Sequence, residues 1–476
     1  MNFRNWQSTL LIGVMTCGLM LSGCQSKDRR ARGAFDQYQA ADARGDLPAA
    51  RRALLALVTA DDTVADYWVQ LGKVQVQLGD YGGAFNAFQR AHELDRANPA
   101  VLGFITQIAL RSGNLPLAEK TAHELELVAP TDPAVPLTYG YVALRQGNFA
   151  EADRQAKLLL ATAPNDPSGN VLRARILFRS ETPEKAIALL SEQVRLQPSD
   201  ELSLRALLSI YQFREEWSEA AAVAASLLVL HPKDSAVRTR LIESELRSGK
   251  AQPALRSTVD GLDAAVPREV ELLLAPWVET GGQRVISPKL FELASKSQGD
   301  RRLAMARFLA SADRPEQVLQ LTSALATKPV NAANLAANAL YGSALAEAGQ
   351  AVLGLERLDA VIRLDGGNAD ALRGRAKFRS RTGLHKLAIE DAQKLIASDR
   401  SAPQSRLLLA NLYAAAGQIN NARRTLWDAF HEIPAERSVY EALRTFVLKA
   451  DGPSGVQSLT EEFNDQRNDK MSRTFS

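Results

Sequence analysis

The sequence predicts an all-α solenoid in which one pair of helices is repeated along the chain. The main observation is that seven alanines stand 34 residues apart, at Ala50, Ala84, Ala118, Ala152, Ala186, Ala220 and Ala254. Two further columns keep the same phase: the glycines Gly45, Gly79, Gly113, Gly147 and Gly249, and the prolines Pro130, Pro164, Pro198 and Pro232. A fixed period of this size indicates a single supersecondary unit that is stacked on copies of itself.

Each unit holds two stretches of helical length, for example residues 66–78 and 81–94, separated by Gly79 and Asp80. In the second stretch Ala84, Phe88 and Ala91 lie on one helix face, because they follow the i, i+4, i+7 spacing. Glycine ends the first helix where a left-handed residue is needed, and proline prevents the second from continuing. The unit is therefore a helix, a short turn and a second helix.

Small residues mark the points where helices cross. A large side chain at a crossing would push two helix axes apart, which explains the alanine column. A second small column supports the same geometry and comprises Gly72, Gly140, Ala174, Gly342, Ala376 and Ala410.

One unit resembles the tetratricopeptide repeat family closely. Its residues match the family's aromatic, Leu-Gly, Gly, Tyr, Ala, Phe, Ala and Leu-Asp columns, at Trp68, Leu71, Gly72, Gly79, Tyr81, Ala84, Phe88, Ala91, Leu94 and Asp95. The resemblance implies a right-handed superhelical solenoid of about 12–13 units. It also implies that the first helices of the units line a concave groove.

The columns divide the chain into segments. Residues 33–266 form an array of seven units, and residues 332–450 form a second array in which Gly349, Gly383 and Gly417 keep the period and which ends at the start of a capping unit. Residues 267–331 are either degenerate repeats or a hinge. Residues 451–476 are a C-terminal cap with a polar tail.

The first residues are predicted to be a targeting signal. Arg4 precedes an apolar run at residues 10–21, which is too short to span a bilayer comfortably. The ending Leu21-Ser22-Gly23-Cys24 resembles the bacterial lipoprotein signal. That resemblance implies that residues 1–23 are removed, that Cys24 is acylated, and that residues 24–32 form a tether.

Cysteine usage supports lipidation. The chain has two cysteines, and Cys17 would be removed with the signal, so no intrachain disulfide is possible in the mature chain. An aspartate after the lipidated cysteine usually signals inner-membrane retention in Gram-negative lipoproteins. By this resemblance Gln25 implies an outer-membrane anchor, with the solenoid facing the periplasm.

Composition and motifs argue against several function classes. The 57 basic and 54 acidic residues nearly balance, so nothing drives general binding to nucleic acid. None of the five histidines lies three or four residues from another, and no nucleophile, phosphate-loop or metal motif is found. We expect no enzyme, no cofactor and no metal.

Four arginines share one column just before the turns, at Arg111, Arg145, Arg179 and Arg247. One interpretation is that each complements the macrodipole and free carbonyls of its own helix C-terminus. The other is that stacked units align them into a basic rail for an acidic partner. The two interpretations are compatible.

The second array contains a denser basic stripe. Arg373, Lys377 and Arg381 lie four residues apart and so share one helix face. By family resemblance this face lines the groove, and basic residues at the first two positions clamp a partner's C-terminal carboxylate. The matching positions one unit earlier are Ala339 and Ser343, which departs from such a clamp. An acidic peptide, an anionic lipid or polysaccharide, or plain solvent would also suit the stripe.

In the first array, Leu137 and Tyr141 lie one helical turn apart and could form an apolar contact point, or pack on the next unit. Taken together, the sequence predicts a lipid-anchored scaffold that binds protein partners in a cell-envelope assembly. Exopolysaccharide export or surface-protein sorting is favoured over pilus, secretin or outer-membrane-protein assembly. A polyanion-binding protein is the alternative of another class.

Overall fold

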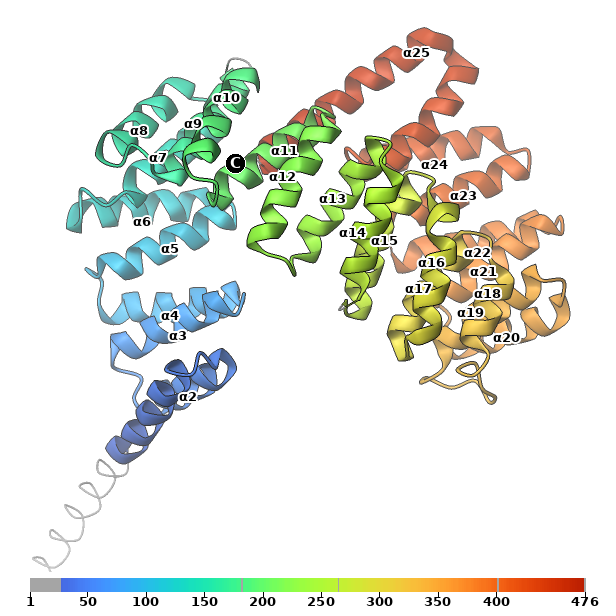
Figure 1. Cartoon of the computed structure of the whole chain (residues 1–476), viewed down its shortest axis with the longest axis horizontal. Coiled ribbons are helices and arrows are strands. Elements are labelled where there is room, and N and C mark those ends of the chain that lie inside the picture. Colours follow the sequence, from blue (N-terminus) through green and yellow to red (C-terminus); the bar gives the residue numbers. More distant parts are fainter. Residues whose placement is uncertain (1–26, 181–182, 264, 400–401, 475–476) are drawn as a thin grey trace, which may run out of the picture. The chain divides into compact units, whose positions relative to one another are not determined.

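The computed structural model describes residues 27–180, 183–263, 265–399 and 402–474, and all regular structure in these ranges is helical (Figure 1). The predicted signal peptide and Cys24 lie outside the described residues. The chain forms two compact units, one up to Ala186 and one from Ile187 onward. Within the described residues no helix is both long enough and apolar enough to cross a bilayer.

The helices of the first unit follow one another in antiparallel pairs. A helix over residues 27–42 comes first, so the basic segment expected to be a tether is helical from residue 27. It is followed by α2 (Leu47–Ala60), α3 (Ala65–Gln77), α4 (Tyr81–Leu94), α5 (Pro99–Arg111), α6 (Leu115–Val128), α7 (Ala134–Arg145), α8 (Phe149–Thr162), α9 (Pro167–Ser180) and α10 (Pro183–Leu196), which runs across the boundary.

The second unit continues the pairing. Its helices are α11 (Glu201–Phe213), α12 (Trp217–Leu230), α13 (Ser235–Arg247), α14 (Ala251–Leu262), α15 (Pro267–Glu279), α16 (Gln283–Lys296), α17 (Gly299–Ser311), α18 (Pro315–Thr322), α19 (Leu335–Glu347), α20 (Ala351–Leu364), α21 (Ala369–Arg381), α22 (His385–Ser398), α23 (Pro403–Ala415), α24 (Ile419–Glu432) and α25 (Arg437–Thr474).

The same turn and cap start four of the second helices of the first unit, α2, α4, α6 and α8. The turn glycine takes a positive φ, as at Gly79 (φ 77°), and the next residue caps the helix. The carboxylate of Asp80 accepts a hydrogen bond from the backbone N–H of Gly83 at 2.9 Å. Asp46, Asn114 and Asn148 cap α2, α6 and α8 in the same way. Such caps satisfy a backbone donor that the helix itself leaves free.

The alanine column lies at the helix crossings, as the sequence predicts. All seven alanines of the column are 0% exposed. The second small column is equally constrained. A Cβ built on Gly72 would lie 2.7 Å from the ring of Phe88, and one on Gly140 would lie 2.5 Å from a methyl group of Leu172. The crossings therefore admit no larger residue without moving the helices.

Residues 267–331 contain two helix pairs, α15 with α16 and α17 with α18, and irregular backbone follows the short α18. Their core is built around Trp277, which is 0% exposed and donates its indole N–H to Thr258 Oγ1 at 2.9 Å. This part of the chain packs into the same core cluster as Ile242 of α13 and Leu340 of α19.

The C-terminal segment, expected to be a cap with a polar tail, is helical through Thr474. α25 bends at Gly452, and its second arm buries Leu459 and Phe463, which lie one turn apart. The Phe463 ring stacks on Tyr440 at a centroid distance of 4.1 Å. These two buried apolar residues hold the arm in place. Their helical spacing predicts an anchored helix, but it is easily overlooked because most of the neighbouring residues are polar.

Replacing Ala152 with tryptophan tests the crossing. Ala152→Trp overfills the contact between α7 and α8, so we expect a loss of about 3 kcal/mol or more in the free energy of unfolding, measured by urea denaturation. Ala161 is exposed on the same helix, and Ala161→Trp is the matched control, with an expected change under about 0.5 kcal/mol. Equal denaturation curves for the two variants would contradict the crossing.

Candidate binding groove

A groove of about 610 Å³ runs along the first helices of successive pairs in the second unit, from α15 through α17, α19 and α21 to α23. Its floor is apolar and includes Leu274, Val278, Phe308, Leu340 and Leu407. The groove exists because each first helix presents one face inward, while its opposite face packs on the second helices. It is therefore a surface to which every pair from α15 to α23 contributes.

Charged side chains of both signs surround the floor. The carboxylates are Glu271, Glu279, Glu347 and Asp370, and the cations are Arg307, Arg373 and Lys377. The sequence analysis identified Arg373 and Lys377 but not the carboxylates. With four acidic and three basic groups in its lining, the groove is not the basic stripe that α21 alone suggests.

Arg307 neutralises part of this charge. Its guanidinium donates to both carboxylate oxygens of Asp370, and the distances to the nearer oxygen are 2.9 and 2.8 Å. It also donates to Glu271 at 2.5 Å, so these bonds tie α17 to α21 and α15. A further cation beside Asp370 is Arg373, at the long distance of 3.5 Å. Arg307 is thus a structural bridge, and Arg373 keeps most of its donor capacity.

Glu347 and Lys377 face each other less closely. Neither side chain forms a hydrogen bond or ion pair within the parts of the chain that the structure describes. Burial raises the pKa of Glu347, and the nearby positive charges of Lys377 and Arg381 oppose that rise. A carboxylate and an ammonium group in a half-buried groove are free to pair with a ligand.

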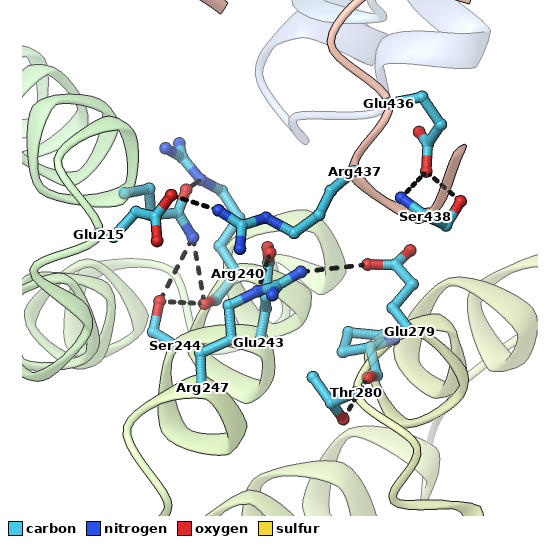
Figure 2. Close-up of polar contacts among 12 residues, drawn as sticks. Glu215, Arg240, Glu243, Ser244, Arg247, Glu279, Thr280, Glu436, Arg437 and Ser438 are labelled. Atoms are coloured by element: carbon cyan, nitrogen blue, oxygen red, sulfur yellow. Dashed lines mark hydrogen bonds and ion pairs between the residues drawn. The ribbon is translucent and has the colours of Figure 1, made fainter. Parts of the chain in front are cut away.

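Glu279, at the end of α15, is the most perturbed carboxyl group of the groove. Burial raises its pKa to about 7, and the negative charges of Glu243 and Glu436 add to the effect. Arg247 opposes the rise from 4.0 Å away (Figure 2). Near neutral pH this group therefore exchanges between a neutral and a charged form.

Arg381, the third residue of the predicted stripe, does not line the groove. Its guanidinium donates to the carbonyl of Ala346 at 3.2 Å, in the last turn of α19. It therefore satisfies a helix C-terminus of the preceding pair. The two remaining arginines of α21 point elsewhere: Arg375 and Arg379 both bind Asp391 of α22, which is 1% exposed.

Three of the four arginines of the predicted rail are held between neighbouring pairs. Three of them stack on an aromatic ring that begins the second helix of the preceding pair: Arg111 on Tyr81 at 4.5 Å, Arg179 on Phe149 at 5.6 Å and Arg247 on Trp217 at 5.1 Å. Arg179 also donates to the carbonyl of Leu144 at 3.0 Å. Arg145 lies at the exposed C-terminal end of α7. The column thus joins repeats to one another through cation–π contacts.

Leu137 and Tyr141 of α7 pack against the core cluster that contains Ala152 and Leu172. The guanidinium of Arg175 lies 5.1 Å from the Tyr141 ring. These contacts agree with packing on neighbouring helices rather than with an apolar contact point for a partner.

The first unit has a second hollow, of about 530 Å³, beside α6, α7 and α8. Its polar groups are largely satisfied from within. Tyr139 donates to Glu126 at 2.9 Å, and burial with this bond raises the pKa of Tyr139 to about 12. Glu151 accepts from Arg154 and Gln155. The groove of the second unit is the better candidate for a binding site, because its Glu347 and Lys377 are not paired with other side chains of the described residues.

Two of the four carboxylates of the groove could have been found in the sequence. Glu279 and Glu347 stand two residues before Gly281 and Gly349, the place that Arg247 holds before Gly249. The middle segment shifts the phase by two residues, since Gly249 and Gly349 are 100 residues apart rather than a multiple of 34. If positions are counted from the turn glycines instead of by a fixed period, Glu279 and Glu347 fall in the same column as Arg247, two residues before the glycine.

The raised pKa of Glu279 gives a test with a definite sign. Its carboxyl group contributes stability below its ordinary pKa of 4.5, and this stability is lost as pH rises through about 7. We expect Glu279→Gln to match wild type at pH 5 and to exceed it at pH 8 in the free energy of unfolding. Because the side chain is 39% exposed, solvent screening limits the difference to about 1 kcal/mol. The control Glu390→Gln, exposed on α22, should show no such trend, and a parallel pH profile for Glu279→Gln would contradict the assignment.

Comparisons with known proteins agree with the helical-repeat architecture. Models of the tetratricopeptide repeat match residues 75–137 in one case and residues 35–100 and 137–201 in another. No curated protein matches the chain.

Several solved structures are similar to parts of the chain. A tetratricopeptide repeat protein of Thermus thermophilus is 23% identical over 38% of this chain and all of its own, with a TM-score of 0.36. One from Parabacteroides merdae is 12% identical over 52% of this chain and 99% of its own, with a TM-score of 0.40. YrrB, described as a repeat protein with an unusual peptide-binding site, is 17% identical over 39% of this chain and 96% of its own, with a TM-score of 0.32. The family models support tetratricopeptide repeats in residues 35–201, and proteins built from such repeats generally act as non-catalytic scaffolds for protein–protein interaction.

Proposed function

We propose that this protein is a scaffold that holds a protein partner, and that the groove of the second unit grips an exposed segment of that partner. The observation that carries the proposal is the combination of an apolar floor with side chains whose charges are not used internally, Glu347 and Lys377. Apolar pockets with a few placed polar groups are the usual form of a binding site.

The charges of the groove indicate what kind of segment fits. Lys377 and Arg373 suit a carboxylate of the partner, while Glu347 and Glu279 suit a basic side chain. Apolar side chains between these groups would cover the floor formed by residues such as Phe308. A segment of mixed charge fits better than a polyanion, because the lining has four carboxylates against three cations and one of these cations, Arg307, is already paired. This favours a peptide over a polysaccharide.

Crosslinking in intact cells tests the groove. We expect Arg373→Glu/Lys377→Glu to lose at least one envelope partner that wild type captures, as identified by mass spectrometry. The control is Lys386→Glu/Lys394→Glu, which makes the same charge change on exposed residues of α22 outside the groove. Loss in the groove variant alone supports the proposal. Identical partners in all three proteins would show that the groove is not the site.

We also propose that Cys24 carries lipid and anchors the scaffold in the outer membrane, facing the periplasm. Its support is the sequence ending Leu21-Ser22-Gly23-Cys24 and the Gln25 that follows it. Each buried methylene contributes about 0.8 kcal/mol, so several acyl chains hold the protein at the membrane. Within the envelope, exopolysaccharide export or surface-protein sorting is the favoured setting, and pilus, secretin or outer-membrane-protein assembly is the alternative.

Metabolic labelling tests the anchor. In a Gram-negative host fed an alkyne-bearing palmitate analogue, wild type should take up label and Cys24→Ser should not. Cys17→Ser is the matched control, since it removes the other cysteine and should label like wild type. Gln25→Asp should move the labelled protein to the inner-membrane fraction. Label on Cys24→Ser would refute the lipid assignment.

A further inference from the structure

The last helix of the chain returns to the first pair of the second unit. Arg437 and Arg467 of α25 both form ion pairs with Glu215, in the turn between α11 and α12, and the distance from Arg467 is 3.0 Å. Arg467 also donates to the carbonyl of Phe213, and its guanidinium lies 5.2 Å from the Phe213 ring. Figure 1 shows the second arm of α25 running to α11, and Figure 2 shows Arg437 pointing at Glu215. More than 200 residues separate these partners in sequence.

Glu215 occupies a turn position that glycine fills in most other pairs. The turn glycines have φ between 66° and 91°, and they are Gly45, Gly79, Gly113, Gly147, Gly249, Gly281, Gly349, Gly383 and Gly417. Glu215 adopts φ 61°, which is a strained conformation for a residue with a Cβ. The turn itself would form more easily with glycine. The carboxylate, which two arginines of α25 contact, is the feature that glycine could not supply.

α25 is bound very differently on its two sides. Against α23 and α24 it buries apolar residues, including Val439, Leu443 and Phe463. Against the turn at Glu215 the contacts come from two arginine side chains, and these ion pairs remain partly hydrated, with Glu215 37%, Arg437 32% and Arg467 20% exposed. Partly exposed ion pairs are weak and salt-sensitive. The contact with Glu215 can therefore open while the core of the helix stays packed.

The start of α25 lies close to the groove. Glu436, just before the helix, is near enough to Glu279 to raise the pKa of its carboxyl group, and Glu279 lines the groove. Figure 2 shows Glu436, Arg437, Arg247 and Glu279 in one view. Movement of α25 thus changes the surroundings of the groove directly.

We propose that α25 is a latch: Arg437 and Arg467 hold Glu215 in the closed form, and release of this contact, which frees the rim of the groove at Glu279 from the start of α25, increases capture of the partner by the groove. The closed form, in which α25 contacts the turn at Glu215, is inferred from the contacts alone. The control of access rests on the proposed function of the groove.

Distance measurements between spin labels test the closure. The labels are placed at Ser226→Cys on α12 and Ser458→Cys on α25, both exposed, in a chain that also carries Cys17→Ser and Cys24→Ser. We expect one narrow distance in this parent protein. Glu215→Gly, which keeps the left-handed turn without the carboxylate, should give a longer and broader distribution.

Asp313→Gly is the matched control for the label distance, because Asp313 also has a positive φ (52°) but lies outside the latch. It relieves the same kind of strain and should leave the distance unchanged. A broad distribution in the parent protein, or the same narrow distance in Glu215→Gly as in the parent, would overturn the latch.

Partner capture separates access from closure. If Glu215→Gly captures at least twofold more of the groove-dependent partner than the wild-type chain does, the latch controls access. If the label distances show that α25 is released in Glu215→Gly but the variant captures no more partner than wild type, the latch does not control access. The failure of Arg373→Glu/Lys377→Glu to change capture would instead refute the groove, and the label distances would still decide the closure.

Discussion

The close crossing of two helices at a residue without a long side chain is the constraint on which this architecture depends. It recurs at Ala84, Ala152 and Ala220, each 0% exposed, and fixes how the helices of a pair approach one another. Once that distance is set, the remaining faces have defined roles. One face of each first helix packs on its neighbours, and the other faces inward, so the inner faces of successive pairs make a groove. The candidate groove is a consequence of the crossing.

Packing also decides which charged residues remain available. Arg179 and Arg381 look alike in the sequence, each just before a turn, and both donate to a helix C-terminal carbonyl of the preceding pair. Arg373 and Lys377 differ because they lie further from the end of α21 and reach no such carbonyl in the described part of the chain. Arg179 therefore satisfies a helix-terminal carbonyl, but one of the neighbouring pair rather than of its own helix. Cation–π contact with Phe149 adds a second link between pairs, worth about 0.5–1 kcal/mol at a partly exposed site.

The repeat and the crossings were within reach of the sequence because both depend on local periodicity, and the placement of Arg373 and Lys377 in a groove followed from the family resemblance. The rest depends on contacts that periodicity does not encode. The roles of Arg375 and Arg381 follow from which neighbour lies within reach, Asp391 in one case and Ala346 in the other. The carboxylates Glu279 and Glu347 were hidden by a phase shift. The meeting of Arg467 with Glu215 needs the path of the whole second unit, which no local pattern specifies.

Glu215 shows how a departure from a repeat can be interpreted physically. Its left-handed conformation costs about 1–2 kcal/mol relative to glycine, and this cost is the same whether or not α25 is in contact. The strain therefore does not set the balance between closed and open forms. That balance depends on two partly hydrated ion pairs, the hydrogen bond from Arg467 to the carbonyl of Phe213 and one cation–π contact, each worth about 1 kcal/mol or less. A sum of about 2 kcal/mol leaves a few per cent of molecules open, a population that a ligand in the groove can enrich through modest differential affinity. A stronger, apolar contact at the same place would hold α25 in the closed form and prevent such enrichment.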